Sequence, residues 1–206
     1  MPMKFYIDTH KGATFLFVLL LMAFFGRWDS PAAWLYLALH GVYGALWVLK
    51  SRIFPDRSWE RPVSLAYGVG VVWGGLTLYW IAPVLLMLRD VQPPAWWLGL
   101  CAALYSLGVF THFAADMQKH TVLALRPGLI TDGMFARVRN PNYFGELLIY
   151  LGFGLLAMHW APLLVIGLFV AFYWLPNMRR KDRSLSRYPG FESYRRRTQL
   201  LIPFLF

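Results

Sequence analysis

Long runs of apolar residues, almost without charge, constrain this chain more than any other feature. The longest, Val63–Leu88, contains no Asp, Glu, Lys or Arg. A helix needs about 20 such residues to cross the hydrocarbon of a bilayer, where its backbone polar groups must be satisfied internally. The sequence therefore predicts an all-α, polytopic membrane bundle. We expect six spanning helices: Ala13–Gly26, Ala32–Leu49, Val63–Leu88, Ala95–Ala115, Tyr143–Ala157 and Ala161–Leu175.

Two features leave the number of spans open. The first and fifth candidates are short, and Pro83 lies inside the third, where it is expected to kink or split the helix. Five to seven spans therefore fit the pattern. A Pro/Gly/Ser-rich linker is lacking, so residues 1–206 are expected to form one membrane domain.

Charged residues gather on alternate loops. Basic side chains lie between the second and third spans, between the fourth and fifth, and in the C-terminal tail, whereas the other loops carry almost none. This asymmetry, rather than nucleic-acid binding, explains the formal net charge of +10, because cytoplasmic loops of membrane proteins are rich in Lys and Arg. Both termini are therefore expected in the cytoplasm of a bacterial inner membrane, with anionic lipid headgroups beside the basic loops.

Cysteine and histidine offer little for a metal site. The single Cys101 excludes an internal disulfide and a multi-cysteine site. The histidines are isolated, and a zinc ion needs three or four convergent ligands, so no metal is expected.

The most specific polar motif is Arg137–Glu146, RVRNPNYFGE, at the start of the fifth span. Ionisable groups at membrane depth cost several kcal/mol each unless something compensates, so they are candidates for function. A positive-inside signal would need only basic residues, and the motif therefore favours a ligand site. The last two spans form a hairpin with its tip at 158–162, which is expected to return residues 140–146 and 177–182 to the same side.

Together these motifs resemble the cofactor-binding core of the superfamily that joins steroid 5α-reductases, sterol reductases, isoprenylcysteine carboxyl methyltransferases and phospholipid methyltransferases. The resemblance covers residues 116–206: DMQK at 116–119, LRPG at 125–128, NYFGE at 142–146 and the basic tail ending IPFLF. It implies that residues 1–115 form the lipid-substrate side. It also implies that a nucleotide cofactor is held by Asp116, Lys119, Arg126, Arg139, Asn140, Asn142, Tyr143, Glu146, Arg179, Asp182, Tyr194 and Arg197.

The resemblance also implies individual roles. Arg126 is expected to bind the diphosphate or 2′-phosphate, and Tyr194 with Arg197 to contact the adenosine or a phosphate. Asp182 is expected to meet a ribose or an arginine. The family usually has His where this chain has Asn140, a change that replaces a titratable group with a neutral amide.

Two enzymes fit this resemblance. A reductase would use NADPH to reduce a conjugated double bond of a steroid- or isoprenoid-like lipid, and would need a hydrogen-bond donor at the developing enolate. The catalytic candidates are Tyr43, His40 and Tyr79. The alternative is an S-adenosylmethionine-dependent methyltransferase acting on an isoprenylcysteine carboxylate, a phospholipid or another lipophilic acceptor, which needs no strong acid.

The arginine-rich loops and the tail favour the reductase, although the first four spans lack an obvious embedded Glu to pair with a tyrosine. A non-catalytic membrane scaffold would bind neither cofactor. The expected partners are a lipophilic small molecule and membrane lipids, without nucleic acid or an obligate protein partner.

Overall fold

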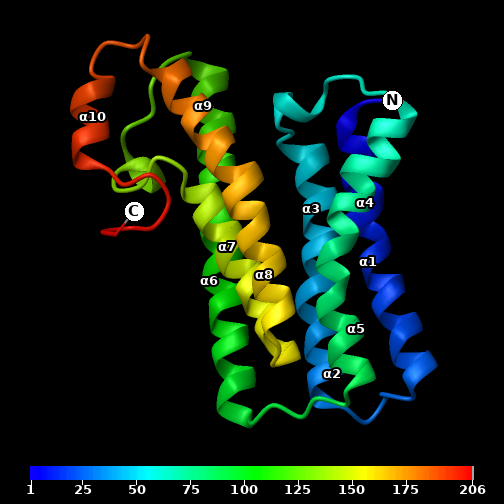
Figure 1. The fold of residues 1–206 in the computed structure, drawn as a ribbon. Helices are drawn as coiled ribbons and strands as arrows, with labels where there is room; N and C mark the ends of the chain where they lie inside the picture. The colour runs from blue at the N-terminus through cyan, green and yellow to red at the C-terminus, as the bar shows by residue number, and fades with distance from the viewer. Residues whose placement is uncertain (206) are drawn as a thin grey trace. The chain divides into compact units, whose positions relative to one another are not determined.

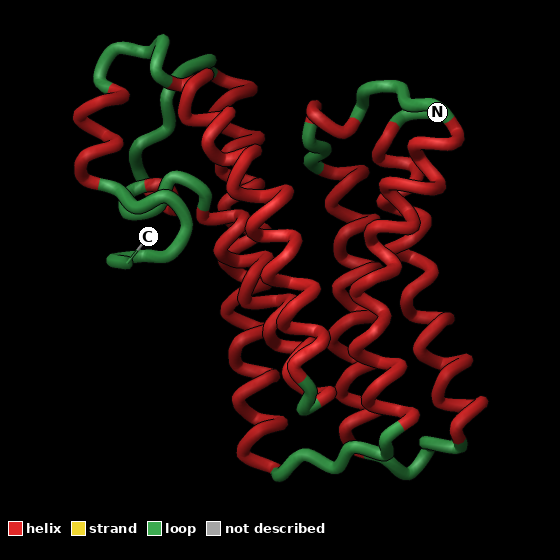
Figure 2. The backbone as a smooth tube through the Cα atoms, in the orientation of Figure 1, coloured by secondary structure: helices red, strands yellow, loops and turns green. Residues whose placement is uncertain are grey.

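The computed structural model describes residues 1–205, except for the side chain of Arg57. In that range the chain consists of helices and loops, with two isolated bridges and no β-strand (Figures 1 and 2). The all-α membrane fold is therefore confirmed. Five helical segments among the described residues are long and apolar enough to cross a membrane: Met3–Phe25, Pro31–Ile53, Tyr67–Leu88, Ala95–Leu125 and Trp160–Leu185.

Ten α-helices follow one another along the described chain: α1 (Met3–Phe25), α2 (Pro31–Tyr36), α3 (Val42–Ile53), α4 (Gly74–Thr77), α5 (Ile81–Leu88), α6 (Ala95–Leu125), α7 (Pro141–Gly154), α8 (Trp160–Phe169), α9 (Leu175–Leu185) and α10 (Phe191–Arg197). Three π-helical turns keep neighbouring helices continuous. Leu37–Gly41 joins α2 to α3, Tyr67–Trp73 leads into α4, and Val170–Trp174 joins α8 to α9.

The structure moves one predicted boundary and decides two points that the sequence left open. The first span begins at Met3 instead of Ala13, so the helix includes polar residues that the prediction had left outside. Pro83 does not split its helix, since Tyr67–Leu88 is one continuous helical segment. Within it the 3-10 turn Leu78–Trp80 directly precedes α5, the helix that contains Pro83. The fifth predicted span is α7 with one 3-10 turn, Leu155–Ala157, which is shorter than the five long helices.

The chain divides into two compact units, Met1–Tyr105 with Tyr150–Val165, and Ser106–Ile149 with Ile166–Phe206. In the first unit α1 packs against α3 and α5. Gly44 on α3 permits this, because a Cβ there would collide with the backbone carbonyl of Lys11. The expectation of a single membrane domain stays a prediction.

In the second unit, α6 and α7 approach closely at two glycines. A Cβ on Gly145 would lie 2.7 Å from the carbonyl oxygen of Gly108 and would strike the backbone nitrogen of His112. Backbone atoms cannot rotate away, so small residues allow these helices to touch, as is common in membranes. The close approach that Gly145 permits is therefore to α6.

The C-terminal segment folds back along the loop that precedes α7 (Figure 1). Arg139 N donates to Gln199 O at 2.9 Å, and Gln199 N donates to Arg137 O at 2.9 Å. Together they form a parallel bridge between Val138 and Gln199. Residues 137–139 and the tail are thus held side by side. Phe206, the last residue of the IPFLF ending, lies outside the described residues.

Candidate functional site

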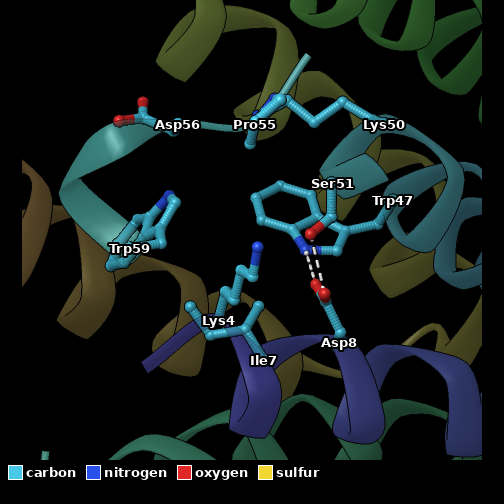
Figure 3. A pocket seen from close by; sticks show the side chains of 9 residues that line it. All are labelled: Lys4, Ile7, Asp8, Trp47, Lys50, Ser51, Pro55, Asp56 and Trp59. Atoms are coloured by element: carbon cyan, nitrogen blue, oxygen red, sulfur yellow. Dashed lines mark hydrogen bonds between the residues drawn. The ribbon is translucent and has the colours of Figure 1, made fainter. Parts of the chain in front are cut away.

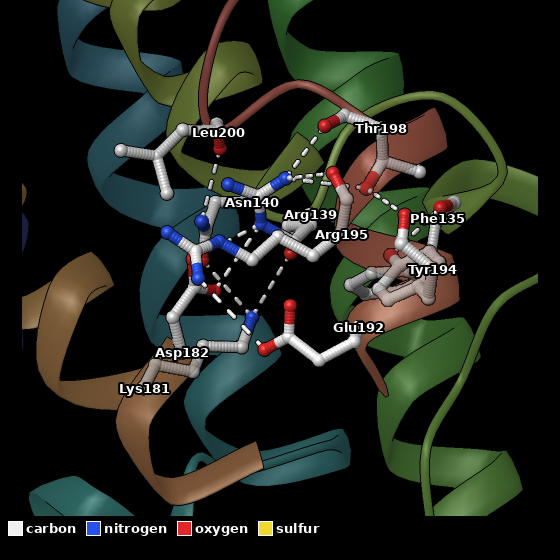
Figure 4. A network of polar contacts seen from close by, with 10 residues as sticks. All are labelled: Phe135, Arg139, Asn140, Lys181, Asp182, Glu192, Tyr194, Arg195, Thr198 and Leu200. Carbon is white, nitrogen blue, oxygen red and sulfur yellow. Dashed lines mark hydrogen bonds and ion pairs between the residues drawn. The ribbon is translucent and has the colours of Figure 1, made fainter. Parts of the chain in front are cut away.

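Arg139 is the centre of a polar network in the second unit (Figure 4). Its Nε donates to the two Asp182 carboxylate oxygens at 3.1 and 3.3 Å. Its Nη1 donates to the carbonyl oxygens of Thr198 at 2.6 Å and Arg195 at 3.2 Å. Only 8% of Arg139 is exposed, and charge-assisted bonds of this kind are about twice as strong as neutral ones. The guanidinium therefore ties the loop before α7 to α9 and to the tail.

Asn140 extends this network and is fully buried. Its Nδ2 donates to Leu200 O at 3.0 Å, and its Oδ1 accepts from Lys181 Nζ at 3.0 Å. Lys181 Nζ also donates to Arg139 O at 3.2 Å. An amide offers a donor and an acceptor together without carrying charge, so one side chain serves the tail and α9 at once. These contacts also confirm that residues 140–146 and 177–182 return to the same end of the hairpin.

Tyr194 closes the network from α10. Its hydroxyl donates to Phe135 O at 2.8 Å, and its own carbonyl accepts from Thr198 Oγ1 at 2.7 Å. Burial disfavours the phenolate and raises the pKa of Tyr194 to about 12. The guanidinium carbon of Arg197 lies 5.8 Å from the centre of the Tyr194 ring. In this arrangement Arg139, Asn140, Asp182 and Tyr194 hold the C-terminal fold-back in place, and direct cofactor contacts for them stay a prediction.

The α6 side of the site is a chain of polar contacts. His112 Nδ1 lies 2.9 Å from the carbonyl oxygen of Asn142, and because a carbonyl only accepts, Nδ1 carries the proton. His112 Nε2 is 3.8 Å from Asp116 Oδ2, and Lys119 Nζ is 3.7 Å from Asp116 Oδ1. The buried Asp116 carboxylate thus lies beside a histidine and a lysine.

Gln118 fixes the loop that follows α6. Its Nε2 donates to Asp132 O at 3.1 Å, and its Oε1 accepts from Met134 N at 2.9 Å. Gly133 between them has φ 54°, a left-handed conformation that favours glycine. Gln118 on α6 therefore holds the Asp132-Gly133 turn in place.

Asn142 carries an unsatisfied polar atom. Its Oδ1 is buried and has no hydrogen-bond partner among the described residues. A buried acceptor left unpaired costs about 1–3 kcal/mol. A ligand N–H group that donates to Asn142 Oδ1 would recover this free energy. The next residue, Tyr143, faces Trp174 with ring centres 5.4 Å apart. Exposed cations in the same unit include Arg126, Arg137 and Arg179.

Comparison with known families matches residues 64–206 to the family described as 3-oxo-5-alpha-steroid 4-dehydrogenase. The chain belongs to this family. The match includes α4 to α6 and so reaches further than the motifs at 116–206 alone.

One curated relative is the uncharacterized protein YpbQ of Bacillus subtilis (strain 168), which is 29% identical to this chain over 113 residues. The match covers 52% of this chain and 66% of YpbQ, just under two thirds of that protein. No solved structure matches the chain significantly.

A reductase of the steroid 4-dehydrogenase family needs an acid, and the sequence candidates lie in the first unit. His40 stacks on Phe153 with ring centres 3.9 Å apart, and its Nδ1 is 2.8 Å from the Tyr36 hydroxyl. These contacts hold the buried His40 ring in the core of the first unit. Tyr79 stacks on Tyr150 with ring centres 4.1 Å apart.

Tyr43 has a polar partner that sequence reasoning missed. The Nζ atom of Lys11 donates to the hydroxyls of Tyr43 at 3.2 Å and of Tyr150 at 3.1 Å. Lys11 was missed because the first span was expected to begin only at Ala13. The available signal was a lysine directly before an apolar run that is too short by itself to cross a bilayer.

A small pocket lies in the first unit (Figure 3). It is lined by Lys4, Ile7, Asp8, Trp47, Lys50, Ser51, Pro55, Asp56 and Trp59. Asp8 accepts from Ser51 Oγ at 2.7 Å and from Trp47 Nε1 at 3.2 Å, and Lys4 pairs with Glu60 at 2.6 Å. Its cavity volume of about 10 Å³ holds about one water molecule. Within residues 1–205, no group of three or more His, Cys, Asp or Glu side chains could hold a metal ion.

Proposed function

We propose that this protein is an NADPH-dependent membrane reductase that saturates a conjugated carbon–carbon double bond in a steroid- or isoprenoid-like lipid. The observation that carries the proposal is the buried Oδ1 of Asn142, which has no hydrogen-bond partner among the described residues. An amide acceptor in that state fits a cofactor carboxamide or amino group. Family membership supports the reaction class.

The residues of the second unit fit such a cofactor. Asn142 and Glu146 would accept from its carboxamide or amino group, and the aromatic pair of Tyr143 and Trp174 offers a face for a ring. The exposed Arg126 and Arg179 would bind phosphates. Cations of this kind favour a phosphate-bearing cofactor over S-adenosylmethionine, which has no phosphate.

The bound cofactor would supply a hydride. The protein must then stabilise the negative charge that develops on the substrate carbonyl oxygen and provide a proton. Tyr43, which accepts a hydrogen bond from Lys11, is the candidate donor in the first unit. A hydrogen bond from a phenol to a developing oxyanion stabilises the transition state far more in a site that excludes water than in solution.

Isothermal titration of the purified protein with NADPH, NADH and S-adenosylmethionine tests the cofactor. We expect NADPH to bind most tightly. Arg126→Ala should weaken NADPH about 10- to 100-fold and NADH much less, if Arg126 meets the 2′-phosphate. Arg52→Ala, which removes an exposed arginine of the first unit, is the matched control. Tighter binding of S-adenosylmethionine would favour the methyltransferase, and binding of neither would favour a scaffold.

We further propose that the basic ends of both units face the cytoplasm of a bacterial inner membrane. In the first unit Met3 N donates to Arg61 O at 3.0 Å, so the N-terminus lies beside a basic loop. In the second, the tail lies beside Arg137 through the bridge at Gln199. Basic loops remain on the cytoplasmic side during insertion.

Cysteine labelling tests this orientation. The native Cys101 is buried and should stay unlabelled by an impermeant maleimide. Cysteines replacing the exposed Ser58 and Ser186 should react only in inverted vesicles, and one replacing the exposed Gln92 only in right-side-out vesicles. The reverse pattern contradicts the orientation.

A further inference from the structure

Lys11 is a buried cation within a helix long and apolar enough to span a membrane. Only 6% of the residue is exposed. Its Nζ lies within hydrogen-bond distance of the Tyr43 and Tyr150 hydroxyls, and 4.0 Å above the Trp47 ring. Removing an ammonium from water costs several kcal/mol, which such contacts only partly offset. A cation kept at this position is therefore a candidate for function.

The direction of these hydrogen bonds decides the chemistry. An ammonium can only donate, so the phenol oxygens of Tyr43 and Tyr150 accept from Lys11. Each phenol also carries one O–H bond, and this bond holds the proton that the phenol can transfer. The adjacent positive charge also stabilises the negative charge that develops on the phenol oxygen during proton transfer.

We propose that Lys11 is the positioning residue that makes the Tyr43–Tyr150 pair the acid of the reduction. This inference rests on the proposed reductase function. As hydride reaches the carbon β to the substrate carbonyl, the π electrons move to the carbonyl oxygen. A phenol O–H bond breaks and its proton passes to that oxygen, and an N–H proton of Lys11 restores the phenol. The enol then takes a proton from solvent at its α-carbon and returns its O–H proton through the phenol to Lys11. The net change is one hydride from the cofactor and one proton from solvent added across the double bond.

Lys11→Met gives the decisive test, because methionine has a similar volume without charge. The groups named here that contact Lys11 are neutral phenols and an indole ring, so methionine leaves no unpaired charge on them and the variant should fold. With NADPH and a 3-oxo-4-ene steroid as the probe substrate, we expect kcat to fall about 100- to 1000-fold while KM changes little. Tyr43→Phe or Tyr150→Phe should cause a similar loss. Lys50→Met is the matched control, since Lys50 is another buried lysine beside Trp47, and it should keep wild-type kcat.

A spectroscopic measurement separates positioning from packing. With NADP⁺ and a steroid labelled with ¹³C at the carbonyl, bound wild-type protein should show a lowered carbonyl stretching frequency, and Lys11→Met should lose most of that shift. If Lys11→Met keeps both kcat and the shift within the range of Lys50→Met, the inference is wrong while the reductase function stands. If the wild-type protein binds no NADPH or leaves the steroid unreduced, the proposed function fails, and this inference with it.

Discussion

Replacing Arg139 by alanine should release the C-terminal fold-back without unfolding the helices. The change removes donors from Asp182 and from the carbonyls of Thr198 and Arg195. Breaking a buried ion pair from one side costs about 3–5 kcal/mol, because the remaining charge stays unpaired. Since the Asp182 side chain is 16% exposed and partly solvated, we take the lower end, about 3 kcal/mol. That corresponds to about a 150-fold larger equilibrium constant for local opening.

Hydrogen exchange followed by mass spectrometry measures this opening directly. Peptides covering residues 191–205 should exchange about 100-fold faster in Arg139→Ala, whereas α1 and α3 keep their protection. Arg183→Ala, one residue from Asp182 and exposed, is the matched control and should exchange like the wild type. Adding Asp182→Asn to Arg139→Ala should recover part of the loss, because it removes the unpaired charge. If the tail of Arg139→Ala exchanges at a rate within threefold of that in Arg183→Ala, Arg139 does not hold the C-terminal fold-back.

Gly145→Ala should lower the thermal midpoint by several degrees, because its Cβ meets backbone atoms of α6 and overpacking costs about 1–3 kcal/mol. Gly99→Ala on α6, where nothing lies within 4 Å of the added Cβ, should be neutral or stabilising, and equal effects of the two changes would contradict this. Tyr194→Phe should destabilise the tail by about 1–3 kcal/mol at neutral pH by leaving Phe135 O without its donor, again measured by hydrogen exchange. The folded-state pKa of Tyr194, about 12, lies above the unfolded value of 10.0, so its contribution is complete below pH 10 and disappears as the pH rises through 12. Thermal melts should therefore show a smaller loss of stability for Tyr194→Phe than for the wild type over that pH range, and parallel losses would exclude the assignment.

Much of the fold follows from local sequence. The five long helices were predicted by apolar runs alone, and the hairpin tip before α8 by a short polar break. The predicted helix boundaries were less accurate, because mean hydropathy is taken over several residues and hides a short polar end of a helix. That is why α1 was expected ten residues too late, at Ala13, and Lys11 was left outside it.

Local sequence predicted only part of the candidate site. The NYFGE motif and the arginines marked the cofactor end, but the motif residues could not reveal that Arg139, Asn140 and Tyr194 would be bound to the chain itself. Their partners lie 41 to 60 residues away in sequence, and no local pattern encodes them.

The sequence by itself determined that this chain is a helical membrane protein with a polar, arginine-rich end, because transfer of each side chain into lipid depends on its own chemistry. The tertiary structure alone decided which polar groups meet. Lys11 and Tyr150 are 139 residues apart, and their contact depends on how α1, α3 and α7 turn their faces. Those faces are set by close packing at positions such as Gly44, a property of pairs of helices that no single stretch of sequence contains.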